Sequence, residues 1–370
     1  MKLKLDTSKT YAIALEGGGA KGGYEIGVWR ALEEMGIRYN AVSGTSVGAL
    51  NGAMMAMRDL PRARAAWEDI RLDKVIDIDA DQEENLAKVL SGEMDAADIQ
   101  QMIPQAFDVI RNRGLDVAPL REWVRETVDC KKIKESDVAL FVAAVSITDR
   151  KGLEIKVNDL PEDEICDMLL ASAYHPTFRL ERLGGKLYAD GGFIDSLPLH
   201  VLVENGYKDI IAVRIPSRFA HQRRFKIPPD VSVSYVDTSA DLGGVLNFTA
   251  AQARRDMAIG YLDAYHDLCG LYGEHYYIDR TMTEREALDI ILDSYMRGQS
   301  DIPIRELCEK ELPRLAKRLG ATGGYYELLI ALLETAADGM DIEKLKIYTD
   351  REFLSAIAAG GSAAAEEEAE

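Results

Sequence analysis

The sequence contains few cysteines and no long apolar run. Its four cysteines are far apart and form no C-x-x-C pair, which predicts free thiols in a reducing compartment rather than disulfides or a thiolate metal site. No segment approaches the roughly 18 unbroken apolar residues of a membrane-spanning helix, and the first residues show no basic-then-apolar signal segment. We therefore expect a cytoplasmic protein whose contact with a membrane, if it has any, is peripheral and transient.

Positive charge is also scarce, because 44 lysines and arginines stand against 63 aspartates and glutamates, for a net charge of −19. This surplus of negative charge argues against nucleic-acid binding and against electrostatic adhesion to an anionic membrane. Apolar residues make up 47% of the 370 residues, which is enough for a large buried core. The length suits one large α/β domain with an appendage.

Strand and helix patterns alternate in the first part of the chain. We expect an apolar strand over 11–15, a glycine-rich loop, a helix over 24–35 and a second strand that leads to Ser46. This order predicts an α/β fold with a mostly parallel central sheet. A second strand–helix–strand unit with parallel strands is expected over 186–215.

The rest of the chain reads as mostly helical. A helical insertion is expected at about 61–128, and an apolar strand over 138–147 is followed by a hairpin partner. From 241 to 358 the pattern predicts almost only helices, and 359–370 reads as a disordered acidic tail. We therefore expect a catalytic domain over 1–240, a helical C-terminal region over 241–358 and the tail.

The motif Gly44-Thr45-Ser46-Val47-Gly48 follows a short apolar run and precedes a stretch rich in small residues. A G-x-S-x-G pattern between a strand and a helix is typical of a nucleophile elbow. The tight turn leaves no room for side chains at the two glycines, and it predicts a strained backbone at the serine. An ordinary Gly/Ser turn remains the alternative for this motif alone.

A second motif, Asp190-Gly191-Gly192, follows a short predicted strand. Open α/β sheets bind their ligands at the carboxyl ends of strands, which makes Asp190 a candidate catalytic carboxylate. Asp149, at another strand end, is the second candidate. Taken alone, Asp-Gly-Gly is better explained as a simple turn.

The third motif is Gly17-Gly18-Gly19-Ala20-Lys21-Gly22, which lies between a predicted strand and helix. It matches the G-x-G-x-x-G fingerprint of dinucleotide-binding proteins. The acidic residue that such a protein places at the end of the next strand is missing, since that strand leads to Ser46. The loop can instead supply backbone N–H groups to an oxyanion hole.

The three motifs in this order and spacing resemble the patatin-like phospholipase family, over roughly residues 9–215. The resemblance implies a three-layer α/β/α fold and a Ser–Asp dyad without histidine, with Ser46 as nucleophile and Asp190 as its partner. It also implies that the glycine loop, Gly17, Gly18, Gly19, Lys21 and Gly22, forms the oxyanion hole. The chain departs from the family pattern at Lys21, where arginine is usual, and at Ser196, where asparagine is common.

The five histidines fit no Ser–Asp–His triad, because none is predicted in a strand-end turn after Asp190. His221 alone is not excluded as a triad histidine by its position in the sequence. We therefore expect a serine lipid acyl hydrolase of the phospholipase A, lysophospholipase or esterase type, with no cofactor and no metal. Its partner would be a phospholipid or another acyl ester. The alternatives are a nucleotide-binding protein that uses Gly17–Gly22 and a non-catalytic interaction homologue. The sequence gives no indication of the oligomeric state.

Overall fold

The computed structural model describes residues 1–78, 114–216, 221–238, 240–298 and 302–367. Much of the expected insertion at 61–128 lies outside these residues. The chain divides into two compact units. The N-terminal unit is Leu5–Ala264, and the C-terminal unit combines Met1–Lys4 with Tyr265–Glu370. The division falls inside helix α10, Ala250–Cys269, whereas the sequence suggested a boundary near residue 240.

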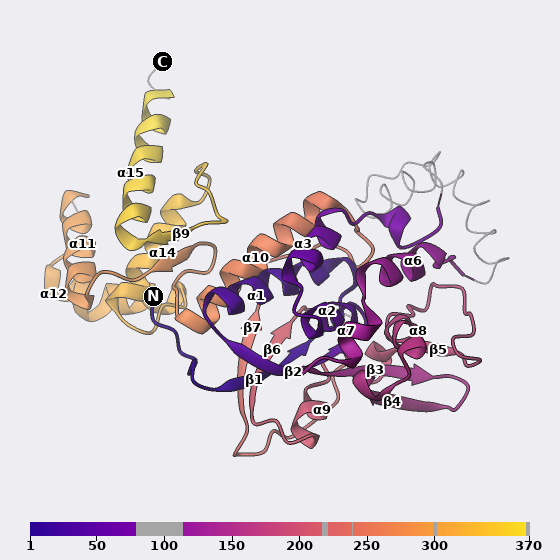
Figure 1. Ribbon diagram of the computed structural model, residues 1–370. Coiled ribbons are helices and arrows are strands. Elements are labelled where there is room, and N and C mark those ends of the chain that lie inside the picture. Colours follow the sequence, from indigo (N-terminus) through magenta and orange to yellow (C-terminus); the bar gives the residue numbers. More distant parts are fainter. Residues whose placement is uncertain (79–113, 217–220, 239, 299–301, 368–370) are drawn as a thin grey trace. The chain divides into compact units, whose positions relative to one another are not determined.

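The N-terminal unit is built on a seven-stranded sheet with the order β4-β3-β2-β1-β6-β7, and β5 pairs with β3 (Figure 1). The strands β1, β2, β6, β7 and the first part of β3 pair in parallel, and β4 and β5 run antiparallel to β3. The strands are β1 (Thr10–Leu15), β2 (Arg38–Thr45), β3 (Ala139–Ser146), β4 (Lys151–Lys156), β5 (Tyr188–Asp190), β6 (Asp209–Arg214) and β7 (Ser232–Asp237). The mostly parallel sheet predicted from the sequence is present.

Helices cover both faces of this sheet, which gives three layers (Figure 1). Helix α9 packs on one face against alanines and larger apolar residues of β1, β2, β3 and β6. Helix α2 packs on the opposite face, where a Cβ at Gly52 would lie 3.0 Å from Leu140 Cδ1. The helices of this unit are α1 (Gly23–Glu34), α2 (Val47–Ala56), α3 (Leu60–Glu68), α6 (Ala118–Thr127), α7 (Cys130–Lys134), α8 (Glu162–Ser172), α9 (Leu199–Glu204) and the first part of α10.

The second parallel unit expected over 186–215 is wrong. Strand β5 runs antiparallel to β3, and β6 pairs with β1 at a different place in the sheet. Strand β2 ends at Thr45, opposite Ala143, and β5 takes over the same edge of β3 from Ala144 onward. A strand of three residues has too short a hydrophobic pattern to predict which strand it pairs with or in which direction it runs.

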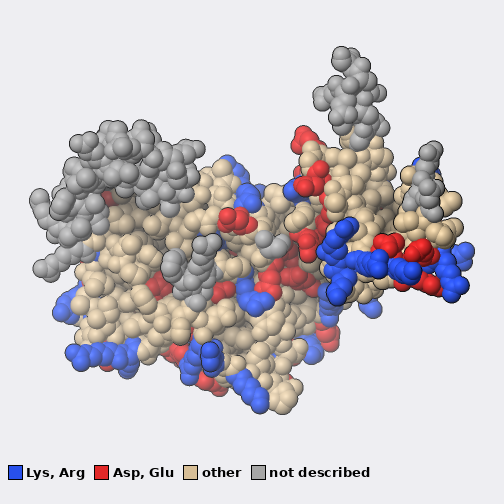
Figure 2. Space-filling model, turned by 180° about the vertical axis from the view of Figure 1, so that it is seen from behind, with Lys and Arg blue, Asp and Glu red and all other residues tan. Residues whose placement is uncertain are grey.

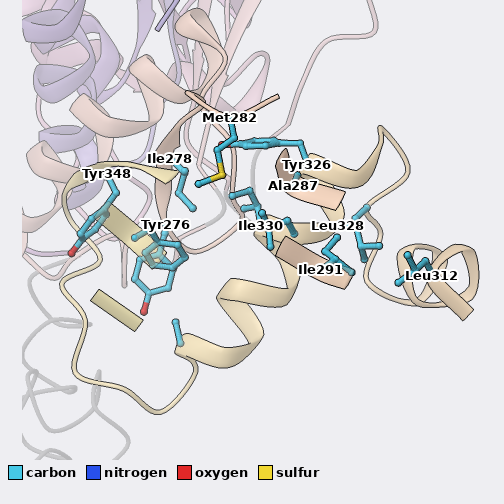
Figure 3. Packing of buried hydrophobic residues seen from close by; sticks show 14 of the residues in the cluster. Tyr276, Ile278, Met282, Ala287, Ile291, Leu312, Tyr326, Leu328, Ile330 and Tyr348 are labelled. Carbon is cyan, nitrogen blue, oxygen red and sulfur yellow. The ribbon is translucent and has the colours of Figure 1, made fainter. Parts of the chain in front are cut away.

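The C-terminal unit has its own apolar core, which Figure 3 shows around Met282, Ile291, Tyr326 and Ile330. Its helices are α11 (Glu284–Arg297), α12 (Ile304–Glu306), α13 (Leu312–Arg318), α14 (Tyr325–Ala337) and α15 (Asp350–Glu367). The sequence predicted almost only helices here, and the structure adds two short strands, β8 (Tyr277–Asp279) and β9 (Ile347–Thr349), which form a small parallel sheet. Helix α15 continues to Glu367, into the segment predicted as a disordered tail; alanine and glutamate there are strong helix formers.

Charged side chains are mixed over the face drawn in Figure 2, where lysines and arginines lie near aspartates and glutamates. On α12 and α13 and between them they form short-range ion pairs, such as Arg305 with Glu309 and Arg314 with Glu311. Among the described residues no helix is both long and apolar enough to cross a membrane.

Candidate active site

Ser46 lies between the end of β2 and the start of α2, with φ 56° and ψ −125°. A non-glycine residue with this backbone is strained and persists only where its surroundings hold it. The two flanking glycines explain the tightness of the turn. A Cβ at Gly44 would lie 2.2 Å from the Gly48 carbonyl oxygen, and one at Gly48 would lie 2.7 Å from that of Leu15. The strained serine that the motif predicts is therefore present.

The backbone of Ser46 is held by Ser172, the last residue of α8. The Ser46 N–H donates to Ser172 Oγ at 2.9 Å, and the Ser172 hydroxyl donates to the Ala143 carbonyl at 2.6 Å. Ser172 is completely buried. One hydroxyl thus ties the nucleophile turn to β3, and Ser172 is a site residue that the sequence motifs did not identify.

The register of β3 brings Asp190 to Ser46. Thr45 is paired with Ala143, and Asp190 is paired with the next residue, Ala144, on the same edge of β3. Strands β2 and β5 therefore meet end to end. A Cβ at Gly191 would lie 2.3 Å from the Ala143 carbonyl oxygen, so only glycine allows this close approach.

Asp190 is a buried carboxylate, 9% exposed, that receives few hydrogen bonds. The Gly192 N–H donates to Oδ1 at 2.7 Å, and the Ser46 side chain lies beside the same carboxylate. Burial raises the pKa of Asp190 to about 6, although Gly192 and Ser46 act to lower it. At neutral pH the group is ionised, yet it is more basic than an ordinary aspartate.

The glycine loop packs against a distant segment of the same unit. Gly19 has φ +58°, and a Cβ there would lie 2.3 Å from the Val245 carbonyl oxygen. The Gly17 N–H donates to the Ser196 carbonyl at 2.9 Å, so it is already engaged. Among the described residues, no acceptor is recorded for the N–H groups of Gly18 and Gly19, and both residues line the cavity beside Ser46.

Two other residues of the loop have structural contacts. Lys21 Nζ donates to the Pro216 carbonyl at 3.1 Å. A Cβ at Gly22 would lie 2.4 Å from Val47 Cγ2, so Gly22 lets α1 begin against the nucleophile turn. Neither Lys21 nor Gly22 belongs to the cavity wall.

Glu16, directly before the glycine loop, is a second supporting residue that the motifs did not identify. It is buried and accepts hydrogen bonds from the Ser196 hydroxyl, the Ile215 N–H and the Gln222 amide at 2.8–3.1 Å. Burial raises the pKa of Glu16, and these hydrogen bonds oppose that effect. Its position at the end of an apolar strand could have identified Glu16 from the sequence, because a buried carboxylate requires hydrogen-bond partners.

A cavity of about 490 Å³ opens over Ser46 and Asp190. This volume is in the range of small-molecule sites. The walls are mostly apolar, and Trp67 and Trp123 meet edge to face at 6.5 Å. The apolar wall residues are Val47, Leu50, Trp67, Ile70, Val75, Leu120, Trp123, Ala173, Pro176, Phe178, Phe193, Val245, Leu246 and Phe248.

The remaining candidates lie elsewhere or have other partners. Asp149 is paired with Lys186 at 2.6 Å and is not part of the cavity wall. His221 is exposed, and its carbonyl accepts from the Ser196 N–H. His175 does line the cavity, with Nδ1 2.9 Å from Thr177 Oγ1, and burial lowers its pKa.

One group of side chains has the spacing of a metal site, Glu154, His200 and Glu204. His200 is buried between the carboxylates of Asp195 and Glu154, at 2.8 and 2.6 Å. Burial acts to lower the pKa of His200, but the two carboxylates outweigh it and raise the pKa to about 9. Arg223 also lies 2.8 Å from Nε2. Both ring nitrogens of His200 thus already have charged side chains as partners, and we describe these residues as an ion-pair cluster.

The patatin-like phospholipase family model matches residues 13–203, which include all three motifs. Patatin-like phospholipase domain-containing protein 6 of Homo sapiens is 29% identical over 217 residues, covering 57% of this chain and 14% of that protein. Protein 7 of the same name, from Rattus norvegicus, is 24% identical over 214 residues with the same coverage. Lysophospholipase nte1 of Aspergillus terreus is 48% identical over 48 residues, 13% of this chain and 3% of that protein. The chain thus spans a small fraction of the relatives that it matches.

Proposed function

The chain belongs to the patatin-like phospholipase family, and we propose that it is a serine lipid acyl hydrolase that uses Ser46 and Asp190 as its catalytic pair. The family supports hydrolysis of lipid acyl esters in general. The particular residues are our proposal, and the observation that carries it is that the Ser46 turn and the buried Asp190 meet at adjacent residues of β3. The strained Ser46 backbone supports the same assignment.

In the first half of the reaction, Asp190 accepts the proton of Ser46 Oγ while this oxygen attacks the ester carbonyl carbon. The charge that develops on the carbonyl oxygen is met by the N–H groups of Gly18 and Gly19, with that of Val47 at the start of α2 as a third donor. Each such donor lowers the barrier by about 3–4 kcal/mol. Gly17, Lys21 and Gly22 then shape the loop and do not donate.

In the second half, protonated Asp190 gives its proton to the departing alkoxide, and the acyl group stays on Ser46. Asp190 next takes a proton from a water molecule that attacks the acyl-enzyme, and it returns this proton to Ser46 Oγ as the fatty acid leaves. A base with a pKa of about 6 is suited to both directions of transfer, since it is ionised at neutral pH and still basic enough to accept a proton. Neither half needs an imidazole.

The substrate we propose is a phospholipid or another fatty acyl ester. The apolar wall between α3 and α6 supports an acyl chain lying beside Ser46. We propose that the protein acts in the cytoplasm and meets membrane lipid transiently, without a cofactor.

The test is labelling by a fluorophosphonate probe, which reacts with an activated serine. Wild type should be labelled, Ser46→Ala should not, and Asp190→Asn should be labelled far more slowly. Asp149→Asn is the matched control, because Asp149 is the other strand-end carboxylate, and it should be labelled like wild type. Equal labelling of wild type and Asp190→Asn would contradict the proposed pair.

A further inference from the structure

Two cysteines that are 36 residues apart in the chain lie together in the N-terminal unit. Cys130 is the first residue of α7, and Cys166 lies in the middle of α8. Their Sγ atoms are 2.7 Å apart, within hydrogen-bond distance, and both residues are free thiols and partly exposed. The sequence predicted isolated thiols, so this pairing is a result of the fold.

The two thiols are not equivalent. The hydrogen bond from the Cys166 thiol lowers the pKa of Cys130, against the opposing effects of burial and of the carboxylates of Glu162 and Asp129. The same contact with Cys130, together with burial, raises the pKa of Cys166. Cys130 is therefore the more readily ionised thiol of the pair, and Cys166 is the less readily ionised one. A partly exposed thiolate beside a second thiol is the arrangement that reacts with peroxides.

We propose that Cys130 and Cys166 form a redox-active site that a hydroperoxide oxidises reversibly to an intramolecular disulfide. This proposal does not depend on the hydrolase activity proposed above. Disulfides in reducing compartments are usually transient and redox-sensing, which is the role that two adjacent, accessible thiols can fill.

The chemistry takes two steps. The Cys130 thiolate attacks the terminal oxygen of the hydroperoxide, the O–O bond breaks, and Cys130 becomes a sulfenic acid while an alkoxide or hydroxide leaves and is protonated. The Cys166 sulfur then attacks the Cys130 sulfur, its proton leaves with the sulfenic hydroxyl as water, and the S–S bond forms. Two thiols are oxidised, and one peroxide is reduced to water and an alcohol or to two waters.

Little movement is required. The Sγ atoms need to approach by about 0.7 Å to reach the roughly 2.0 Å of a disulfide. The bond would join α7 to α8, and α8 carries Ser172, the residue that holds the Ser46 backbone. Because the helices are already in contact, we expect the disulfide to lock α8 in its present position and to raise the melting temperature of the unit that contains it.

The chain supplies its own controls. Cys269 and Cys308 belong to the C-terminal unit, so a Cys269→Ser/Cys308→Ser variant keeps only the proposed pair. Cys130→Ser and Cys166→Ser each remove one partner with little change in volume. A further control that needs no substitution is the wild-type protein compared before and after reduction with dithiothreitol.

The experiment treats the reduced full-length protein with hydrogen peroxide, counts thiols after denaturation and maps the peptides by mass spectrometry. Wild type should lose two of its four thiols and yield a peptide pair joined through Cys130 and Cys166. The Cys269→Ser/Cys308→Ser variant should yield the same pair. Cys166→Ser should instead form a sulfenic acid at Cys130 that dimedone traps, and dithiothreitol should restore all four thiols in wild type.

The oxidised wild type should also melt at a higher temperature than the reduced protein, and Cys130→Ser should show no such shift. Several outcomes would overturn the proposal. These are oxidation of Cys130 to sulfinic acid without a disulfide, a disulfide only between molecules, a disulfide that uses Cys269 or Cys308, or four thiols that survive the treatment.

Discussion

Asp190 in the N-terminal unit and Asp350 in the C-terminal unit are both buried aspartates, but their surroundings differ. Asp350 accepts hydrogen bonds from the Thr281 N–H and hydroxyl, the Met282 N–H and the Tyr326 hydroxyl. Burial acts to raise the pKa of Asp350, but these four donors outweigh it and lower the pKa. Asp190 accepts a hydrogen bond from the Gly192 N–H and has Ser46 beside it, and burial raises its pKa to about 6.

The difference separates a structural carboxylate from a reactive one. A carboxylate surrounded by donors is stable as an anion and accepts a proton poorly. One that is buried with few donors destabilises the folded protein when it is ionised, and it is a better base for the same reason.

The largest expected effect is on turnover. Asp190→Asn should lower kcat for a short-chain nitrophenyl ester by roughly 10³–10⁴-fold, because asparagine cannot accept the serine proton. Asp350→Asn should change kcat less than about twofold when measured on folded protein. A similar loss in both variants would mean that Asp190 acts only through stability.

The two aspartates should affect the stability of the folded protein in opposite directions. The folded-state pKa of Asp190 is raised, so its contribution to stability is present below the unfolded pKa near 3.8 and is lost as the pH rises through about 6. At pH 8 the ionised group costs about 3 kcal/mol, which Asp190→Asn should recover. The folded-state pKa of Asp350 is lowered, so its stabilisation is present at pH 8 and is lost in acid.

Asp350→Asn should therefore destabilise the folded protein by about 3 kcal/mol at pH 8, since several buried hydrogen bonds are broken. Calorimetric melting of the two variants beside wild type measures both effects. If Asp190→Asn lowered the melting temperature as much as Asp350→Asn, the contrast between the two aspartates would be wrong.

The support of the nucleophile turn should have an intermediate effect. Ser172→Ala leaves the Ser46 N–H without its acceptor, and we expect kcat to fall roughly 10–100-fold as the turn loosens. Ser43→Ala is the matched control, because the Ser43 hydroxyl is also buried and donates to the Pro198 carbonyl, away from Ser46. Equal losses of kcat in the two variants would show that any buried hydroxyl matters equally.

The smallest effect concerns the cavity wall. Trp123→Ala enlarges the cavity beside Ser46, so the preferred acyl chain among nitrophenyl esters should become longer, with changes in kcat/KM of about 10-fold or less. Trp29→Phe, a buried tryptophan outside the cavity wall, is the control and should leave the chain-length preference unchanged. An unchanged preference in Trp123→Ala would place the acyl chain elsewhere.

Local sequence patterns were enough to predict two parts of this site, the turn at Ser46 and the glycine loop. The turn at Ser46 and the glycine loop follow from residues next to each other in the chain, since a tight turn or a close approach of backbones requires glycine at that position. The apolar strands beside them also predicted the parallel part of the sheet.

The features that the sequence did not predict depend on contacts between residues far apart in the chain. Ser172 meets Ser46 across 126 residues, and Glu16 meets Ser196 across 180, so no local spacing reveals them. The antiparallel direction of β5 depends on where β2 ends, and the three-residue strands β8 and β9 are too short to form a pattern.

The most direct test of Asp190 as the base is the pH dependence of inactivation by a fluorophosphonate. For wild type, the second-order rate constant should rise with an apparent pKa of about 6 and reach a plateau above pH 7. His175→Asn, which alters the titratable histidine of the cavity wall, should keep this profile, and Asp190→Asn should react slowly without it. A wild-type rate independent of pH between 4 and 8, or a profile that disappears in His175→Asn, would contradict the assignment of Asp190 as the base.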